Sequence, residues 1–205
     1  MQKRKKCSIN TSSVLKQIIN ERDSPLSIFR EAISNSFDAN ANIMEVTAKQ
    51  EEKDGENQID IVFKDDGEGM DINELEQFFN AGYTSKDDSK IGEKGLGTKL
   101  FFNTEKIEVL TKKDGTVYKG ILNDPVDDLR DDRIPEYEIE SLDNSCLSQG
   151  TKITLQNLKT NNKRDIFWGN KLKNYLRWKT AAGSIRRFFE GKDDMEVQVE
   201  VSNNK

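Results

Sequence analysis

The chain has 205 residues, of which 34% are hydrophobic and 34% charged, and 32 basic against 37 acidic residues give a net charge of -5. This length predicts one domain, because domains usually contain about 100–200 residues. The negative net charge excludes a general attraction of the whole chain to nucleic acid. No apolar run approaches the roughly 18 residues of a membrane helix, and no signal segment follows the basic start, so we expect a cytoplasmic protein with no membrane partner.

Histidine and cysteine usage narrows the possible chemistry. The chain contains no histidine, which excludes Ser-His-Asp hydrolases, histidine-ligated zinc proteases and a phospho-accepting histidine within this sequence. Cys7 and Cys146 are too few for a disulfide framework or a zinc site, which fits a reducing compartment. Catalysis in this chain must therefore use carboxylates, amides, lysines and backbone groups.

The first half of the chain predicts a helix followed by two strands and a short helix. Ser24 suits an N-cap and Pro25 a first helical turn, so the helix is expected to begin there. Its apolar positions then recur every three or four residues, at Leu26, Phe29, Ile33 and Phe37. The following elements are strands over 43–48 and 58–63 and a short helix over 71–79.

The second half mixes strands and helices. A glycine-punctuated stretch ends in a helix expected to open at Lys99, and Asp114-Gly115 predicts a hairpin between strands 107–111 and 117–122. Seven acids against two arginines in 124–138 predict a solvated loop. Further strands are expected over 152–158 and 196–201, and one or two helices over 165–190. The fold class is therefore α+β with a mixed, mainly antiparallel sheet.

Three side chains of the first predicted helix share one face. Glu31, Asn35 and Asp38 fall within about 60° of one another, roughly opposite the apolar stripe. The simplest interpretation is a solvated helix face. The alternative is a carboxylate base and a metal-binding amide one turn apart, both directed at a ligand.

A second motif, Asp65-x-Gly67-x-Gly69-Met70, directly follows a predicted strand. Its two glycines allow a sharp turn and the close approach of a flat ligand, while the carboxylate can accept a hydrogen bond from an exocyclic amine. An ordinary acidic turn is the alternative. A calcium loop is disfavoured because no glutamate closes it at the required spacing.

A third motif places glycines at 92, 95 and 97 ahead of the helix expected at Lys99. Backbone N–H groups and a helix N-terminus favour a phosphate at such a position. The spacing matches neither a Walker A loop nor a dinucleotide-binding fingerprint. A plain flexible loop is the alternative for this motif taken alone.

These motifs, followed by Gly150-Thr151-Lys152-Ile153, resemble in the same order those of the GHKL ATPases. That superfamily includes gyrase B, dimeric heat-shock chaperones, sensor histidine kinases, MutL and the MORC proteins. The resemblance covers about residues 24–158, and the stretch Gly82-Tyr83-Thr84-Ser85-Lys86 is more similar to the chaperone, MutL and MORC side. It implies a two-layer α/β sandwich with helices on one face of the sheet.

The resemblance also implies ATP hydrolysis with Mg²⁺. Glu31 would be the catalytic base that orients the attacking water, and Asn35 would coordinate Mg²⁺ beside the phosphates. Asp65 would accept a hydrogen bond from the adenine amino group, supported by Thr151. The remaining expected nucleotide contacts are Asp38, Gly67, Gly69 and Met70 around the adenine or ribose, and Lys86, Gly92, Gly95, Leu96, Gly97 and Thr98 in a lid over the phosphates.

The expected organisation is an N-terminal arm over 1–23 and one ATP-binding domain over 24–205. Within this domain we expect the lid at about 80–98, the acidic insert at about 124–138, and a C-terminal helix and strand over 165–201. The resemblance further implies an ATP-gated switch of a larger protein, with homodimerisation on ATP binding and more domains after residue 205. A chaperone-like remodeller is one alternative, and a catalytically inactive nucleotide sensor is disfavoured because Glu31 and Asn35 are both present.

The other alternative is an ATPase clamp that engages DNA. Residues 159–187 carry nine basic residues and one acid, interleaved with aromatic residues that include Trp168 and Trp178. Such a stretch suits contacts with phosphates and stacking on bases. The favoured interpretation is nevertheless an amphipathic helix that buries its aromatic side chains in the core.

Overall fold

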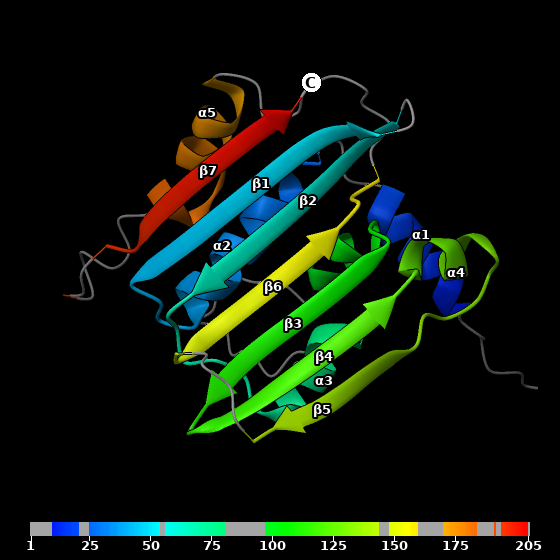
Figure 1. Cartoon of the computed structure of the whole chain (residues 1–205), viewed down its shortest axis with the longest axis horizontal. Helices are drawn as coiled ribbons and strands as arrows, with labels where there is room; N and C mark the ends of the chain where they lie inside the picture. Colours follow the sequence, from blue (N-terminus) through cyan, green and yellow to red (C-terminus); the bar gives the residue numbers. More distant parts are fainter. Residues whose placement is uncertain are drawn as a thin grey trace, which may run out of the picture.

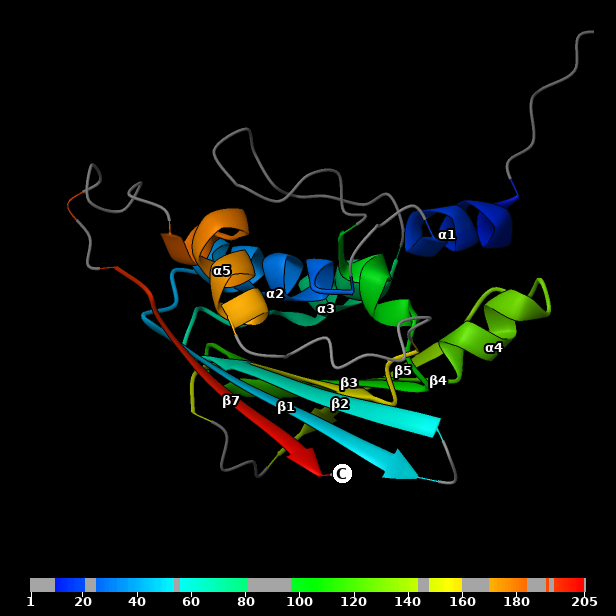
Figure 2. The same ribbon diagram turned by 90° about the horizontal axis from the view of Figure 1, so that it is seen from above.

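The computed structural model describes residues 10–20, 25–53, 56–80, 97–143, 148–159, 170–183, 191 and 194–204. These residues form two layers, a twisted seven-stranded sheet and a set of helices that cover one of its faces (Figure 1). Figure 2 shows α1, α2, α3 and α5 on the same side of the sheet. The predicted α+β sandwich with helices on one face is confirmed.

The sheet has the strand order β5-β4-β3-β6-β2-β1-β7. Every neighbouring pair is antiparallel except β1 and β7, which run parallel at one edge, so the sheet is mixed and mainly antiparallel as predicted. The strands are β1 (Ile43–Lys53), β2 (Glu56–Asp65), β3 (Lys106–Lys113), β4 (Thr116–Asn123), β5 (Tyr137–Leu142), β6 (Gly150–Gln156) and β7 (Glu196–Asn204).

Alternating side chains explain why β1 and β2 form strands. Met44, Val46 and Ala48 of β1 are buried, while the residues between them are exposed on the open face of the sheet. This period of two is expected for a sheet with only one covered face. Asp114 and Gly115 join β3 to β4 with φ values of 50° and 82°, which are the positive angles of a tight hairpin turn.

The helical elements are α1 (Thr11–Asn20), α2 (Ser27–Asp38), α3 (Ile72–Phe79), η1 (Gly97–Phe102), α4 (Pro125–Arg130), α5 (Asn170–Lys179) and η2 (Ala181–Gly183). The predicted start of α2 was two residues too early. Leu26 occupies its N-cap position without a side-chain cap, Pro25 lies in the preceding turn, and Ser24 lies outside the described residues. The helix expected at Lys99 is the short 3-10 helix η1.

Two further expectations differ from the structure. The segment predicted as an N-terminal arm contains α1, whose Leu15 belongs to the hydrophobic core. The predicted acidic loop contains α4, which buries Val126 and Leu129, and then enters β5. In Figures 1 and 2 α1 and α4 lie side by side, and Lys16 of α1 forms a 2.6 Å ion pair with Asp132 beyond α4.

Aromatic side chains connect the elements that carry the sequence motifs. The Phe63 ring of β2 lies 5.5 Å from Phe29 of α2 and 6.3 Å from Phe101 of η1, measured between centroids. Phe101 in turn lies 5.9 Å from Phe78 of α3. Such contacts stabilise beyond the area they bury, so α2, β2, α3 and η1 form one packed unit. None of the helices within the described ranges is long and apolar enough to cross a membrane.

Candidate functional site

The face of α2 singled out from the sequence borders the core without entering it. Glu31, Asn35 and Asp38 are partly exposed, whereas Ala32, Ile33 and their neighbours on the other side are buried. The Asn35 side-chain amide donates a 3.1 Å hydrogen bond to Oε1 of Glu31. The helical spacing of four residues thus brings the expected carboxylate and amide into direct contact.

Gly97, the first residue of η1, packs directly on this carboxylate. A Cβ atom at position 97 would lie only 1.9 Å from Oε2 of Glu31 and 2.1 Å from its Cδ. Any other residue would therefore displace the Glu31 side chain. The structure joins the first and third sequence motifs through this contact.

A buried lysine follows two residues later. Lys99 is fully buried, and its ammonium donates hydrogen bonds to the Phe78 carbonyl of α3 and to Oγ1 of Thr98. Thr98 Oγ1 itself donates to the same carbonyl at 2.9 Å. Burial lowers the pKa of Lys99 to about 7, against the opposing effect of the Glu31 charge.

Asp65 ends β2 and accepts hydrogen bonds from three elements. Its Oδ2 accepts from Ser36 Oγ at 2.9 Å, and its Oδ1 accepts from the backbone N–H groups of Gly67 at 3.0 Å and Thr151 at 3.3 Å. Burial nevertheless raises the pKa of Asp65 above its ordinary value, and these hydrogen bonds offset only part of that effect. Asp65 therefore ties α2, the following turn and β6 together.

The turn after β2 requires its two glycines. Gly69 has a φ of +73°, and a Cβ there would lie 2.0 Å from the carbonyl oxygen of Lys112. A Cβ on Gly67 would lie 2.8 Å from the carbonyl oxygen of Ala39. The turn thus fits closely between the end of α2 and β3, with protein backbone on both sides of its glycines.

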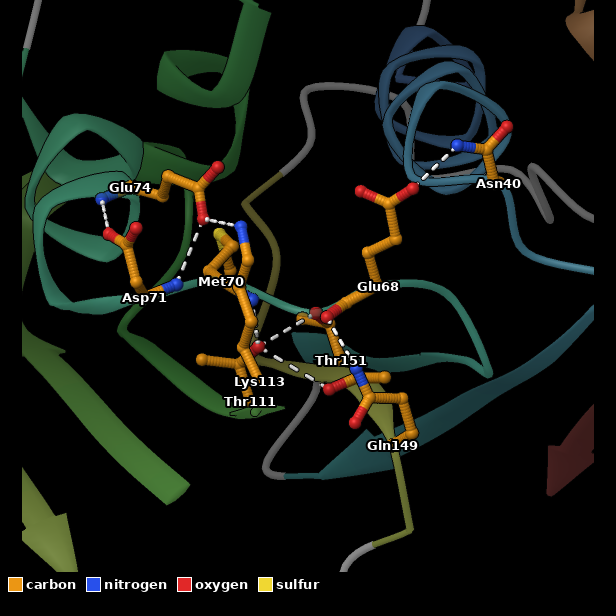
Figure 3. Close-up of polar contacts among 10 residues, drawn as sticks. Asn40, Glu68, Met70, Asp71, Glu74, Thr111, Lys113, Gln149 and Thr151 are labelled. Atoms are coloured by element: carbon orange, nitrogen blue, oxygen red, sulfur yellow. Dashed lines mark hydrogen bonds and ion pairs between the residues drawn. The ribbon is translucent and has the colours of Figure 1, made fainter. Parts of the chain in front are cut away.

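Two threonines support this turn from the sheet. Thr111 of β3 accepts a 2.8 Å hydrogen bond from the Met70 N–H, and its Oγ1 lies 3.0 Å from that of Thr151 on β6 (Figure 3). On the outer side, Gln149 donates to the Glu68 carbonyl at 2.7 Å, and Asn40 donates to the Glu68 carboxylate. The turn is therefore held from both α2 and the strands.

The expected site residues fall into groups within the structure. Glu31, Asn35 and Gly97 form one contact group, and Thr98 adjoins it. Asp38 lies on the same partly exposed face of α2. The second group, around the end of β2, comprises Asp65, Gly67, Gly69, Met70 and Thr151. The predicted contacts Lys86, Gly92, Gly95 and Leu96 lie outside the described residues.

Four residues of these groups were not assigned to the site from the sequence, although Gly150 stands in the fourth motif. Ser36 and Thr111 are ordinary polar residues whose roles depend on distant partners. Gly150 has a φ of +123°, and a Cβ there would lie 2.0 Å from the Asp65 carbonyl oxygen. For Lys99 the sequence did offer a signal of burial, because this lysine directly precedes the apolar run Leu-Phe-Phe.

The donor set fits Mg²⁺ bound together with a phosphate ligand. In the described part of the chain, no group of three or more His, Cys, Asp or Glu side chains would hold a metal ion by itself. Mg²⁺ commonly takes one or two protein oxygens and completes its shell with substrate phosphates and water. The side-chain nitrogen of Asn35 donates its hydrogen bond to Glu31, so the side-chain carbonyl oxygen of Asn35 points away from that carboxylate.

Comparison with known families identifies the class of the chain. The family model for the histidine kinase-, DNA gyrase B- and HSP90-like ATPases matches residues 24–151, which is more than half of the sequence. The chain belongs to this family, which implies ATP binding and hydrolysis. The matched range contains every residue that the sequence analysis assigned to the nucleotide.

A solved structure has the same fold. The crystal structure of the N-terminal domain of a DNA repair protein aligns with a TM-score of 0.52 and 19% sequence identity. The alignment covers 95% of this chain and 53% of that one, so this chain spans about half the length of that structure. No sequence among the curated proteins matches significantly.

Proposed function

We propose that this chain binds ATP with Mg²⁺ and hydrolyses it, with Glu31 as the catalytic base. The observation that carries the proposal is the contact group of Glu31, Asn35 and Gly97. A carboxylate fixed by an amide on one side and by a glycine Cα on the other is held in one orientation. Such positioning is the main protein contribution to phosphoryl transfer.

The group around Asp65 supports adenine binding. Asp65 lies at the end of a strand, and the glycines at 67 and 69 let the following turn pack closely against the carbonyl oxygens of Ala39 and Lys112 beside it. Thr151 contributes its N–H to this carboxylate and its hydroxyl to the contact with Thr111. We assign Asp65 and Thr151 to the adenine end and Asp38, Gly67, Gly69 and Met70 to the surrounding pocket.

The phosphate end is assigned to the residues around Glu31. Asn35 would hold Mg²⁺, which supplies neutralisation of phosphate charge when bound. Gly97 and Thr98 begin η1, and Gly97 packs on Glu31, which supports the assignment of their backbone to the terminal phosphate. We also assign the predicted lid residues to the phosphates. They lie outside the described ranges and are Lys86, Gly92, Gly95 and Leu96.

The decisive experiment separates binding from hydrolysis in the substitution Glu31→Gln. The amide can still accept the hydrogen bond from Asn35 and fill the space beside Gly97, but it cannot act as a base. We expect the affinity for ATP-Mg²⁺ measured by calorimetry to change less than about threefold and phosphate release to fall by about 100-fold or more. Glu140→Gln, on exposed β5, serves as the matched control.

Two results would contradict this assignment. Unchanged phosphate release by Glu31→Gln would remove Glu31 from the role of base. Failure of the wild-type chain to bind ATP-Mg²⁺ would contradict the function as a whole.

We further propose, from the family resemblance, that the domain acts as an ATP-gated switch of a larger protein.

A second candidate function, contact with nucleic acid, is favoured by the exposure of Trp178. This side chain is 74% exposed on α5, although the sequence pattern favoured its burial in the core. The helix carries four basic residues and no acid, at positions 171, 173, 177 and 179. An exposed ring among cations is suited to stack on a base while its neighbours bind phosphates.

Single-stranded DNA labelled with a fluorophore tests this candidate by anisotropy. We expect the affinity for this DNA to fall steeply as the salt concentration rises. At constant salt concentration, we expect Trp178→Ala to lower the affinity several-fold. Lys49→Ala, on the open face of the sheet, is the control variant. If it weakens DNA binding as much as Trp178→Ala does at every salt concentration, the attraction is non-specific. Absence of binding at low salt would dismiss the candidate.

A further inference from the structure

Lys99 is the one lysine in the described part of the chain that is fully buried. The residues that follow it, Leu100, Phe101 and Phe102, are buried and apolar. Taking an ammonium group out of water costs several kcal/mol, and an apolar side chain of similar length would avoid that cost. The position therefore calls for an explanation beyond packing.

Four neighbouring groups compensate the charge of Lys99. Its ammonium donates to the Phe78 carbonyl, which lies in the last turn of α3 and has no intrahelical partner there. It also donates to Oγ1 of Thr98 at 2.9 Å and lies 5.5 Å from the centre of the Phe102 ring. Glu31 is the charged side chain that acts on it.

These contacts fix the residue that packs on the candidate base. Thr98 is bound twice, to Lys99 and to the Phe78 carbonyl, and it directly follows Gly97. The Gly97 Cα in turn lies against the Glu31 carboxylate. A continuous chain of contacts therefore runs from the C-terminus of α3 through Lys99 and Thr98 to Glu31.

We infer that Lys99 is a positioning residue for hydrolysis, which anchors Thr98 to the end of α3 and thereby holds Gly97 and the Glu31 carboxylate in contact. The inference rests on the proposed ATPase function and adds a residue to it. Lys99 itself touches neither nucleotide nor water in this role. A displacement of about 1 Å at the base lowers hydrolysis by about 100-fold without weakening ligand binding.

The alternative is a purely structural role, in which Lys99 only caps α3. The two roles make different predictions for the turnover number of Lys99→Met, whose side chain is one atom shorter than lysine and carries no charge. A capping role predicts lower stability and an unchanged turnover number of the folded protein. A positioning role predicts a reduced turnover number of the folded protein, whatever the change in stability.

The experiment measures three quantities in the wild type, Lys99→Met and the exposed control Lys49→Met. They are the dissociation constant for a non-hydrolysable ATP analogue with Mg²⁺, the turnover number, and the urea midpoint. For Lys99→Met we expect a dissociation constant within about threefold of the wild type and a turnover number about 10- to 100-fold lower. Lys49→Met should match the wild type in all three, because Lys49 is exposed on the open face of the sheet, where it pairs with Glu51.

Equal turnover numbers of Lys99→Met and the wild type would overturn the inference and leave the ATPase proposal intact. Absence of both binding and hydrolysis in the wild type would overturn the ATPase proposal itself. A crystal structure of Lys99→Met, or of Lys99→Gln if the first variant does not fold, tests the geometry apart from turnover. A Glu31 carboxylate moved away from Gly97 supports the inference, and an unchanged contact overturns it.

Discussion

Two carboxylates of the site lie in different surroundings, and their chemistry differs accordingly. Asp65 is enclosed by α2, the glycine turn and β6, and burial raises its pKa although it accepts three hydrogen bonds. Glu31 remains partly exposed on α2 beside Asn35. This contrast fits a recognition group at Asp65 and a reacting group that water can reach at Glu31.

The raised pKa of Asp65 predicts how adenine binding depends on pH. Only the ionised carboxylate accepts a hydrogen bond from the amino group without competition from its own proton. Because the folded-state pKa is raised, the proton binds at a higher pH than in an ordinary aspartate, so affinity should be constant near neutral pH and fall on acidification. Calorimetry with adenosine, which has no phosphate to titrate, measures this dependence.

Asp65→Asn provides the control for that titration. The amide can keep the hydrogen bonds to the Gly67 and Thr151 N–H groups through its oxygen, so we expect a folded protein. Its weaker adenosine binding should not vary with pH over the same range. An identical pH dependence in this variant would assign the titration to another group.

At this scale the sequence indicates the residues proposed to contact the ligand more readily than those that support them. Glu31, Asn35 and Asp65 were predictable because their type and spacing follow from chemistry and helix geometry. Ser36, Thr111 and Lys99 were not, because each acts through a partner at least 20 residues away in the chain. Only the packing of the sheet against the helices brings such partners together.

At the scale of elements, α3 depends on a capping box at its N-terminus. The Asp71 carboxylate accepts from the Glu74 N–H at 2.9 Å, and Glu74 Oε2 accepts from the Asp71 N–H at 2.9 Å. Glu74 also pairs with Lys113 of β3 at 2.7 Å (Figure 3). The cap therefore fixes the helix whose other end binds Thr98 and Lys99.

Asp71→Ala should destabilise the domain by about 1 kcal/mol, because the first turn of α3 loses its side-chain acceptor. Urea unfolding followed by circular dichroism gives this value, and Asp71→Asn, which retains an acceptor oxygen, should lose less. Equal stability of Asp71→Ala and the wild type would show that packing alone maintains α3.

The strand β5 and the helix α1 were not predicted from the sequence. In β5, Tyr137 and Ile139 alternate with Glu138 and Glu140, but the acidic surroundings favoured a loop. Packing of Tyr137 on Phe79, with ring centroids 4.8 Å apart, explains why this strand joins the sheet. α1 likewise carries apolar side chains at helical spacing, at Leu15, Ile18 and Ile19, and the burial of Leu15 secures it in the core.

At the scale of the molecule, the candidate site lies between the sheet and the helical layer. Asp65 and Thr151 belong to β2 and β6 at the centre of the sheet, while Glu31 and Gly97 belong to the helical layer. η1 contacts α1, α2 and α3, so a ligand beside Gly97 would lie next to an element that packs against much of the helical layer. A nucleotide bound across these layers is therefore placed to influence the surface that α1 forms.

We expect this coupling to appear as an ATP-dependent change in assembly. Light scattering should give the monomer mass of 23.5 kDa without nucleotide and with ADP, and twice that mass with a non-hydrolysable ATP analogue and Mg²⁺. Glu31→Gln should form the same dimer with ATP itself, because the nucleotide stays unhydrolysed, whereas the wild type should return to monomer as ATP is consumed. A monomer under saturating analogue would contradict dimerisation of this chain, since a ligand shifts an equilibrium only through its different affinity for the two states.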